Sequence, residues 1–329
     1  MVCCVFIFHQ EAVVKMNQLT IALVGLGDIA QKAYLPIATQ HAQIDPIFCT
    51  RNLTTLTQLA KQYRVQKCFT DYQAVLACKP DGVMIHTNTE SHFTFAKQAL
   101  EQKIATFVDK PLAYSFSEVS ELIALATKHN TPLFLGFNRR FLPIMADIAK
   151  PQIRHLKWQK NRLNLPAQPR TFIFDDFIHV VDSLCHFANV ERFDQLNQLQ
   201  VFSQLDPQGL LAAIHVSFEF EGRLFQGAMD RLSGCNEEVV EITGLNEKWR
   251  FESLTNMTSM VNGIQQSAMQ NDWQATLYKR GFESMLEAWL TAVKTQQVDQ
   301  LQLKKDSLTH ELCEWLVAHV SNNNELFHC

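Results

Sequence analysis

The segment Thr20-Ile-Ala-Leu-Val-Gly25-Leu-Gly27-Asp-Ile-Ala30 decides the fold. A short apolar run leads directly into Gly-x-Gly-x-x-Ala, a pattern typical of a buried strand that turns sharply into a helix. The first glycine permits the tight turn, the second lets a pyrophosphate approach the backbone, and the small alanine lets helix and strand pack closely. Free N–H groups and the positive dipole end at the helix start favour phosphate. The segment therefore predicts a dinucleotide site.

Five more short apolar runs follow this turn and alternate with segments of helical spacing. They lie at residues 46–50, 67–69, 81–86, 104–108 and 132–136. Strands that alternate with helices indicate βαβ units, and hence an α/β fold with a doubly wound parallel sheet covered on both faces. Pro36 lies inside the first helical segment, where it predicts a kink or a break.

The pattern changes after about Phe137, where strand-like segments follow one another directly. These segments are 153–163, 199–205, 212–220, 224–229, 238–244 and 248–252, with helical patterns near 175–187, 282–294 and 308–320. This order predicts an α+β domain with a mainly antiparallel sheet. We expect an extension over residues 1–15, a dinucleotide-binding domain over 16–137 and a substrate-binding and oligomerisation domain over 138–329.

Composition narrows the possible partners of the chain. Its 329 residues include 33 acidic and 29 basic side chains, and the net charge of −4 argues against a nucleic-acid partner. Nine cysteines at irregular spacing, without a Cys-x-x-Cys pair, argue against a disulfide framework or a thiolate metal site and favour a cytoplasmic protein. The sequence contains no apolar run of the roughly 18 residues that a membrane helix needs, so we expect no membrane partner.

The end of the second strand distinguishes NADP from NAD. An acidic residue there would accept from the ribose 2′-OH, whereas an arginine accommodates a 2′-phosphate. The segment Cys49-Thr50-Arg51-Asn52 contains no acid. Thr50 and Arg51 therefore predict NADP, with NAD as the less favoured cofactor. The alternative is that Arg51 is simply a solvated surface residue.

Four later segments carry a family resemblance. They are His86-Thr-Asn-Thr-Glu-Ser-His92, Val108-Asp-Lys-Pro-Leu112, Gly136-Phe-Asn-Arg-Arg-Phe141 and Asp175-Asp-Phe-Ile-His-Val-Val-Asp182. In this order they resemble the Gfo/Idh/MocA oxidoreductases. Together with Asp272-Trp-Gln-Ala-Thr-Leu and Lys279-Arg-Gly-Phe282, they are similar to the MviM-like branch. The resemblance covers about residue 17 to the C-terminus. It implies a Rossmann domain followed by a domain whose open sheet carries the substrate site and often the contact of a homodimer or higher homo-oligomer.

The resemblance also implies which residues form the site. It implies that Lys110, Asp175 and His179 are catalytic. The cofactor residues that we expect are Gly25, Gly27, Asp28, Ile29, Ala30, Thr50, Arg51, Thr87, Asn88, His92, Asp109 and Lys110. Asn88 stands where the family usually has proline, and Asp109 where it has glutamate, so the partner of this shorter acid is open. The Lys110–Pro111 bond is a candidate for the cis form.

The same residues make chemical sense without the resemblance. Lys110 follows the fifth strand, at the sheet edge where such folds bind ligands, and can stabilise an alkoxide as hydride departs. Asp175 and His179 are four residues apart, so both share one helix face if Asp175 begins and caps the helix. His179 can take the hydroxyl proton at neutral pH. The alternatives are a solvated lysine, a capping aspartate and a buried structural histidine.

Two further groups of residues allow more than one interpretation. Asp182 and His186 continue the same helix face and could form half of a metal site, but we favour interior polar residues and expect no metal. Lys160 and Arg162 share a strand face. They predict a substrate carboxylate or phosphate if that face lines the cleft, or a protective basic edge if it does not. Aromatic residues that could stack on a sugar, or belong to the core, are Trp158, Trp273 and Tyr278.

These observations leave three hypotheses about function. The first is an NADP-dependent oxidoreductase that acts on the carbinol or carbonyl of a sugar-like or polyol-like, possibly anionic, small molecule. The second is a regulator of the same fold that binds the cofactor without turnover. The third is an enzyme that holds one NADP tightly while two substrates alternate. The joint presence of Lys110, Asp175 and His179 favours the enzyme.

Overall fold

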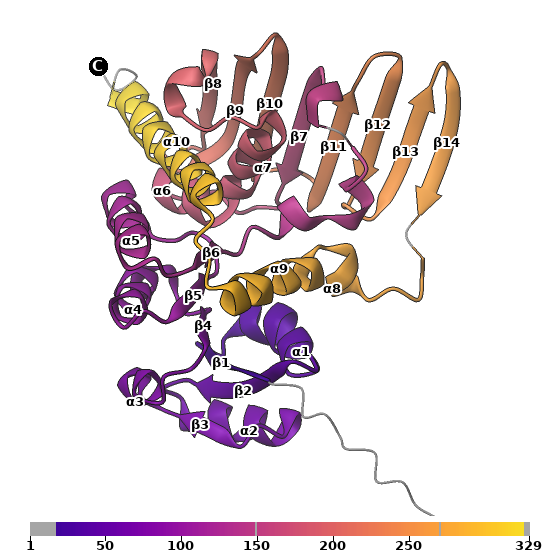
Figure 1. Ribbon diagram of the computed structural model, residues 1–329. Coiled ribbons are helices and arrows are strands. Elements are labelled where there is room, and N and C mark those ends of the chain that lie inside the picture. The colour runs from indigo at the N-terminus through magenta and orange to yellow at the C-terminus, as the bar shows by residue number, and fades with distance from the viewer. Residues whose placement is uncertain (1–17, 149, 270, 326–329) are drawn as a thin grey trace, which may run out of the picture.

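Two β-sheets organise the chain (Figure 1). The structure is a computed structural model that describes residues 18–148, 150–269 and 271–325. The extension expected over residues 1–15 lies outside the described residues. Within the described ranges, no helix combines the length and the apolar character that crossing a bilayer requires.

The first sheet is parallel throughout and confirms the predicted doubly wound arrangement. Its order is β3-β2-β1-β4-β5-β6, so the strand order reverses between β1 and β4. The strands are β1 (Leu19–Val24), β2 (Ile44–Cys49), β3 (Lys67–Phe69), β4 (Gly82–Ile85), β5 (Ala105–Val108) and β6 (Leu133–Leu135). Ligands of such sheets bind at the carboxyl ends of the strands near the point of reversal.

Helices connect these strands. They are η1 (Ala30–Tyr34), α1 (Leu35–Ala38), α2 (Leu53–Tyr63), α3 (Tyr72–Ala77), α4 (Thr89–Glu101) and α5 (Phe116–His129). Two of them, α2 and α3, begin at a residue whose side chain caps the helix. The Asn52 side chain accepts from the N–H of Thr55 at the start of α2, as an N-cap residue does. Pro36 falls in the first turn of α1, where its missing N–H costs no helical hydrogen bond.

The second sheet has the order β14-β13-β12-β11-β7-β10-β9-β8. Only the β7–β10 pair is parallel, so the mainly antiparallel prediction is confirmed. The strands are β7 (His155–Asn161), β8 (Asn197–Leu205), β9 (Leu211–Phe220), β10 (Arg223–Asp230), β11 (Glu237–Thr243), β12 (Glu247–Glu252), β13 (Asn256–Val261) and β14 (Ile264–Met269).

Our sequence interpretation missed β13 and β14. The two strands form a hairpin around Asn262-Gly263, both of which have positive φ. An Asn-Gly pair between two strands is a strong signal for a two-residue turn. The strands themselves are polar and largely exposed, so they lack the apolar alternation that identified the others.

Helices of the second half join the two sheets. They are η2 (Asn138–Phe141), η3 (Pro143–Met145), η4 (Lys150–Gln152), α6 (Pro169–Phe172), η5 (Ile173–Phe177), α7 (Ile178–Ala188), η6 (Phe193–Gln195), α8 (Thr276–Lys279), α9 (Phe282–Thr295) and α10 (Gln300–Glu325). Helix α7 packs on β7 and β10, and α10 packs on α7 and α5. Helix α9 returns to the parallel sheet, where Trp289 packs against Gly82 (Figure 1).

Candidate active site

A groove of about 800 Å³ runs along the glycine turn at the carboxyl ends of β1 and β2. Gly25 has a φ of +85°, and a Cβ on it would lie 2.7 Å from the backbone N of Thr87. Gly27 has open space where a side chain would stand. The turn is therefore tight at the first glycine and bare at the second, which fits a pyrophosphate lying on the backbone. No side chain caps the helix start behind it.

Most of the expected cofactor residues line this groove. They are Gly25, Gly27, Asp28, Ile29, Thr50, Arg51, Thr87 and Asn88. Ala30 is fully buried behind the turn, where helix and strand pack. The Arg51 side chain is exposed and has no partner among the described residues.

His92 lines a neighbouring cavity and not the groove itself. Its ring is buried between two loops, with Nδ1 2.7 Å from the carbonyl oxygen of Pro111 and Nε2 3.0 Å from that of Thr87. It therefore joins the loop after β4 to the turn after β5.

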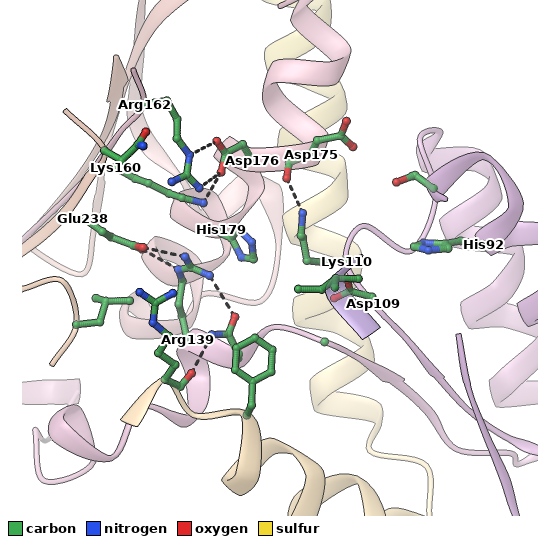
Figure 2. A pocket seen from close by; sticks show the side chains of 18 of the residues that line it. His92, Asp109, Lys110, Arg139, Lys160, Arg162, Asp175, Asp176, His179 and Glu238 are labelled. Atoms are coloured by element: carbon green, nitrogen blue, oxygen red, sulfur yellow. Dashed lines mark hydrogen bonds and ion pairs between the residues drawn. The ribbon is translucent and has the colours of Figure 1, made fainter. Parts of the chain in front are cut away.

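A second cavity of about 690 Å³ adjoins the groove, and the two share Ile29, Thr87 and Asn88. Lys110 enters it from the loop after β5, and Asp175 and His179 enter it from the helical segment η5–α7 (Figure 2). The structure thus brings together the three side chains that are far apart in sequence. Polar and charged groups dominate the remaining wall.

Lys110 is held by a main-chain acceptor. Its Nζ donates to the carbonyl oxygen of Asp175 at 2.5 Å, and its peptide bond to Pro111 is cis. Burial lowers the pKa of Lys110, while Asp109 and Asp175 oppose that shift. One of the three N–H donors is used in this way, so others remain for a substrate oxygen.

The partner of the shorter acid at position 109 is a tyrosine. The Tyr34 hydroxyl donates to Asp109 Oδ1 at 3.0 Å, and the Tyr34 ring stacks on His86 with centroids 4.0 Å apart. A Cβ on Gly136 would stand 2.9 Å from that hydroxyl, so the contact depends on the glycine.

Asp175 does not begin or cap the helix, so that expectation was wrong. The helical segment starts at Pro169, and Asp175 lies in a π turn, η5, between α6 and α7. Proline suits a first helical turn, which explains the earlier start. The Asp175 carboxylate accepts instead from the Tyr114 hydroxyl at 2.6 Å, while its main-chain oxygen receives Lys110. π turns are frequent at functional sites.

His179 lies one turn further on and is partly exposed to the cavity. Its Nδ1 is buried and finds no hydrogen-bond partner among residues 18–148, 150–269 and 271–325. Burial holds the pKa of His179 well below its ordinary value, and the charges of Arg139, Lys160 and Lys110 act in the same direction. The ring is therefore neutral at pH 7 and able to accept a proton.

Lys160 and Arg162 both face the cavity, but an acid from the opposite helix takes up their hydrogen bonds (Figure 2). Lys160 Nζ donates to Asp176, and Arg162 donates to it through Nε at 2.8 Å and Nη2 at 3.1 Å. Arg231 is the third cation at this carboxylate, with a contact of 3.2 Å. Burial opposes the ionisation of Asp176, yet Lys160 and Arg162 hold its pKa below the usual range.

Sequence reasoning missed several side chains of the cavity wall. Arg139 forms a two-pronged ion pair with Glu238, at 2.7 and 2.8 Å, and Trp158 donates to the same carboxylate at 2.9 Å. Arg139 lies inside the segment 136–141, which carries part of the family resemblance. That position could have marked it as a residue of the site. Tyr114 and Glu238 had no such signal, because only the packing of distant elements brings them here.

The aromatic residues do not form a sugar-stacking wall. Trp158 is buried in the core, Trp273 is 95% exposed, and neither Trp273 nor Tyr278 borders the cavity. Asp182 and His186 are interior polar residues with partners, as we favoured: Arg140 pairs with Asp182, and the His186 ring accepts from Lys150. Among the described residues, no group of three or more potential ligands could hold a metal ion.

The fold and the two joined cavities define a class, the nicotinamide-dinucleotide oxidoreductases. Comparisons with known proteins agree. The family model "Oxidoreductase family, NAD-binding Rossmann fold" matches residues 19–137, and that of the "YceM-like, C-terminal domain" matches residues 145–262. A crystal structure of a Gfo/Idh/MocA family oxidoreductase from Vibrio cholerae is 36% identical, with a TM-score of 0.88 over 94% of this chain and 100% of that one.

Two further relatives extend over nearly the whole chain. The MviM dehydrogenase of Clostridium difficile is 27% identical, with a TM-score of 0.83 over 92% of this chain and 99% of that one. The YceM protein of Salmonella typhimurium is 28% identical over 317 residues, which are 92% of this chain and 98% of that protein. The chain therefore belongs to the Gfo/Idh/MocA family of oxidoreductases, and the resemblance seen in the sequence is confirmed.

Proposed function

We propose that the protein transfers a hydride between NADP and the carbinol or carbonyl of a sugar-like or polyol-like small molecule that carries an anionic group. One observation supports this proposal above all: Lys110, Asp175 and His179 meet in a cavity that continues into the groove of the glycine turn. Under this proposal residues 16–137 hold the cofactor, and residues 138–329 hold the substrate and the contact between subunits.

The groove fits the cofactor in both size and chemistry. Its volume of about 800 Å³ lies within the usual range for ligand sites. Gly25, Gly27 and the helix start behind them would hold the pyrophosphate, and Thr87 and Asn88 would border the nicotinamide end, where groove and cavity meet. A bound nicotinamide supplies the hydride donor or acceptor for the reaction.

The side chains of the cavity handle the proton and the oxygen. When a carbinol is oxidised, neutral His179 accepts the hydroxyl proton. Lys110 donates a hydrogen bond to the same oxygen and stabilises the negative charge that develops there. Asp175, fixed by Tyr114, holds Lys110 through its main-chain oxygen. Reduction of a carbonyl runs the same steps in reverse.

Two cations support the choice of NADP and of an anionic substrate. Arg51 has no partner in the described part of the chain and lies in the groove beyond β2, so it is available to a 2′-phosphate. Arg162 uses Nε and Nη2 on Asp176, which leaves Nη1 for a substrate anion at the cavity wall. A partial relative supports the substrate class: a protein of Escherichia coli named D-glucoside 3-dehydrogenase is 26% identical over 134 residues, 40% of this chain and 38% of that protein.

We also propose that the protein is a homodimer or higher homo-oligomer through the second sheet. Phe202 and Leu224 pair with His215 and Glu219 of β9, which are four residues apart, so both lie on one face. The opposite face packs on α7 at Gly227. The Phe202 side chain is 66% exposed, and a contact between subunits would cover its apolar surface.

The test is turnover on a panel of phosphorylated, carboxylated and neutral sugars and polyols, followed by NADPH absorbance. Lys110→Met and His179→Leu should each lose at least about 100-fold in kcat while NADPH still binds, as measured by its fluorescence. Lys128→Met, an exposed lysine on α5, is the matched control and should keep full activity. Turnover that survives both active-site changes, or no turnover on the whole panel, would favour a regulator that only binds the cofactor.

A further inference from the structure

Helix α10 buries a polar face that neither cavity uses. Asp306, Thr309 and His310 are fully buried, and their spacing puts them on one side of the helix. None of the three borders the groove or the catalytic cavity. Buried polar groups are unfavourable unless they are hydrogen-bonded, so their partners indicate their role. We call these three residues the α10 polar face.

His310 holds the main chain just beyond Lys110. Its Nδ1 donates to the carbonyl oxygen of Asp306 at 2.7 Å, which leaves Nε2 as the acceptor for the N–H of Leu112 at 3.0 Å. Burial lowers the pKa of His310 to about 4, so this neutral form persists at pH 7. Because His92 donates to the carbonyl of Pro111, the two residues after Lys110 are held from both sides.

The other two members of the α10 polar face hold the segments that carry the rest of the site. Thr309 donates to Asp182 at 3.2 Å, three residues beyond His179 on α7. Asp306 pairs with Arg140 at 2.7 Å, and Arg140 also pairs with Asp182. Arg140 directly follows Arg139, which lines the cavity.

Three separate segments of the cavity therefore share one anchor. The turn after Lys110, the helix of His179 and the η2 turn of Arg139 each form a hydrogen bond or ion pair with α10. Their three partners lie within the five positions 306–310. Since a misplacement of about 1 Å can cost about 100-fold in rate, a common anchor has catalytic consequences.

We propose that His310, with Asp306 and Thr309, is a positioning residue that sets the placement of Lys110 relative to His179. The expected loss of kcat rests on the proposed function, whereas the expected change in the titration of Lys110 does not. Loss of the Nε2 acceptor releases the Leu112 N–H and lets the Lys110 turn move, whereas the groove that binds the cofactor is left intact.

The experiment compares three variants of the full chain. His310→Leu removes the acceptor, and His310→Gln retains one at the place of Nε2. Val320→Ala opens a small cavity in the same helix, far along from the α10 polar face, and controls for a loss of stability alone. His310→Leu should lower kcat by about 100-fold with KM and the NADPH dissociation constant within about twofold. His310→Gln should recover most of the wild-type rate. Val320→Ala should keep the wild-type rate even where it lowers thermal stability as much as His310→Leu does.

A second readout does not depend on turnover. Lysine side chains carrying ¹³C-methyl labels can be titrated by NMR, with Lys110 assigned through Lys110→Met. His310→Leu should move the pKa of Lys110 upward toward its ordinary value, because the released turn gains water, and His310→Gln should not. If His310→Leu does not fold, His310→Asn carries the same two measurements, because its shorter side chain withdraws the acceptor from the Leu112 N–H.

The outcomes separate the two proposals. If the wild type turns over and Lys110→Met does not, but His310→Leu keeps the wild-type rate and the wild-type Lys110 titration, the positioning role is wrong. If the wild type turns nothing over, the proposed function fails, and the Lys110 titration alone decides the positioning role. Equal losses of rate in His310→Leu and Val320→Ala would show a merely structural contribution and overturn the inference.

Discussion

Asp176 pairs with three cations, of which Lys160 and Arg162 line the cavity and Arg231 lies outside its wall, so its removal should be costly. Lys160 and Arg231 are 2% and 5% exposed at the side chain, and Arg162 is 33% exposed. Removing one partner of a buried ion pair costs about 3–5 kcal/mol, because the other charge stays buried without compensation. Burial already lowers the pKa of Lys160, so in Asp176→Asn this lysine can release its proton. We therefore expect Asp176→Asn to lower the free energy of unfolding by about 3 kcal/mol, near the lower end of that range.

The assay is urea unfolding followed by tryptophan fluorescence at several pH values. The folded pKa of Asp176 lies below its ordinary value of 3.8, so its contribution to stability is complete above that value and is lost as the pH falls toward the folded pKa. The wild type should lose stability below about pH 4, and Asp176→Asn should lose less over the same interval.

Asp175→Asn is the matched control for this prediction. Within the described ranges its side chain has one hydrogen-bond partner, Tyr114, and the amide retains an acceptor, so the loss of unfolding free energy should stay at about 1 kcal/mol. A loss below about 1 kcal/mol for Asp176→Asn, or equal losses in the two variants, would refute the view that this acid compensates the buried cations.

Three further predictions concern the cofactor, the assembly and the response to acid. Arg51→Asp should reverse the cofactor preference, with NADPH binding weakened by about tenfold or more and NADH binding kept. If a fluorescence titration shows that the wild type already prefers NADH, Arg51 does not select NADP. The double variant Phe202→Glu, Leu224→Glu should be a monomer by light scattering, whereas a wild type that is itself monomeric would disprove the subunit contact. Burial lowers the pKa of His86 to about 3 and that of His310 to about 4. The unfolded chain therefore binds more protons below about pH 6.5, and stability should fall on acidification by up to about 1.4 kcal/mol per pH unit for each ring. His86→Phe should flatten that slope in urea unfolding, and an unchanged slope would show that the ring is not held neutral.

The sequence by itself determined the parallel sheet, the glycine turn and the segments that carry the site. Each of these is a local pattern: buried strands read as short apolar runs, and the turn at Gly25 needs a residue that tolerates positive φ. Lys110 could be placed for the same reason, since it follows directly on a buried strand. The hairpin of β13 and β14 was also readable from Asn262-Gly263, and our interpretation overlooked it because its strands are polar.

Only the tertiary structure decided how these segments meet. Lys110 contacts a carbonyl 65 residues away, and Leu112 contacts His310, which is 198 residues away. Tyr114, Asp176 and Glu238 take their roles from such encounters, and no spacing along the chain records them. The start of the helix at Pro169 likewise changed Asp175 from an expected cap into a residue that receives both Tyr114 and Lys110. Periodicity reports which face of an element is buried, whereas the partner of a buried polar group depends on which elements pack against that face.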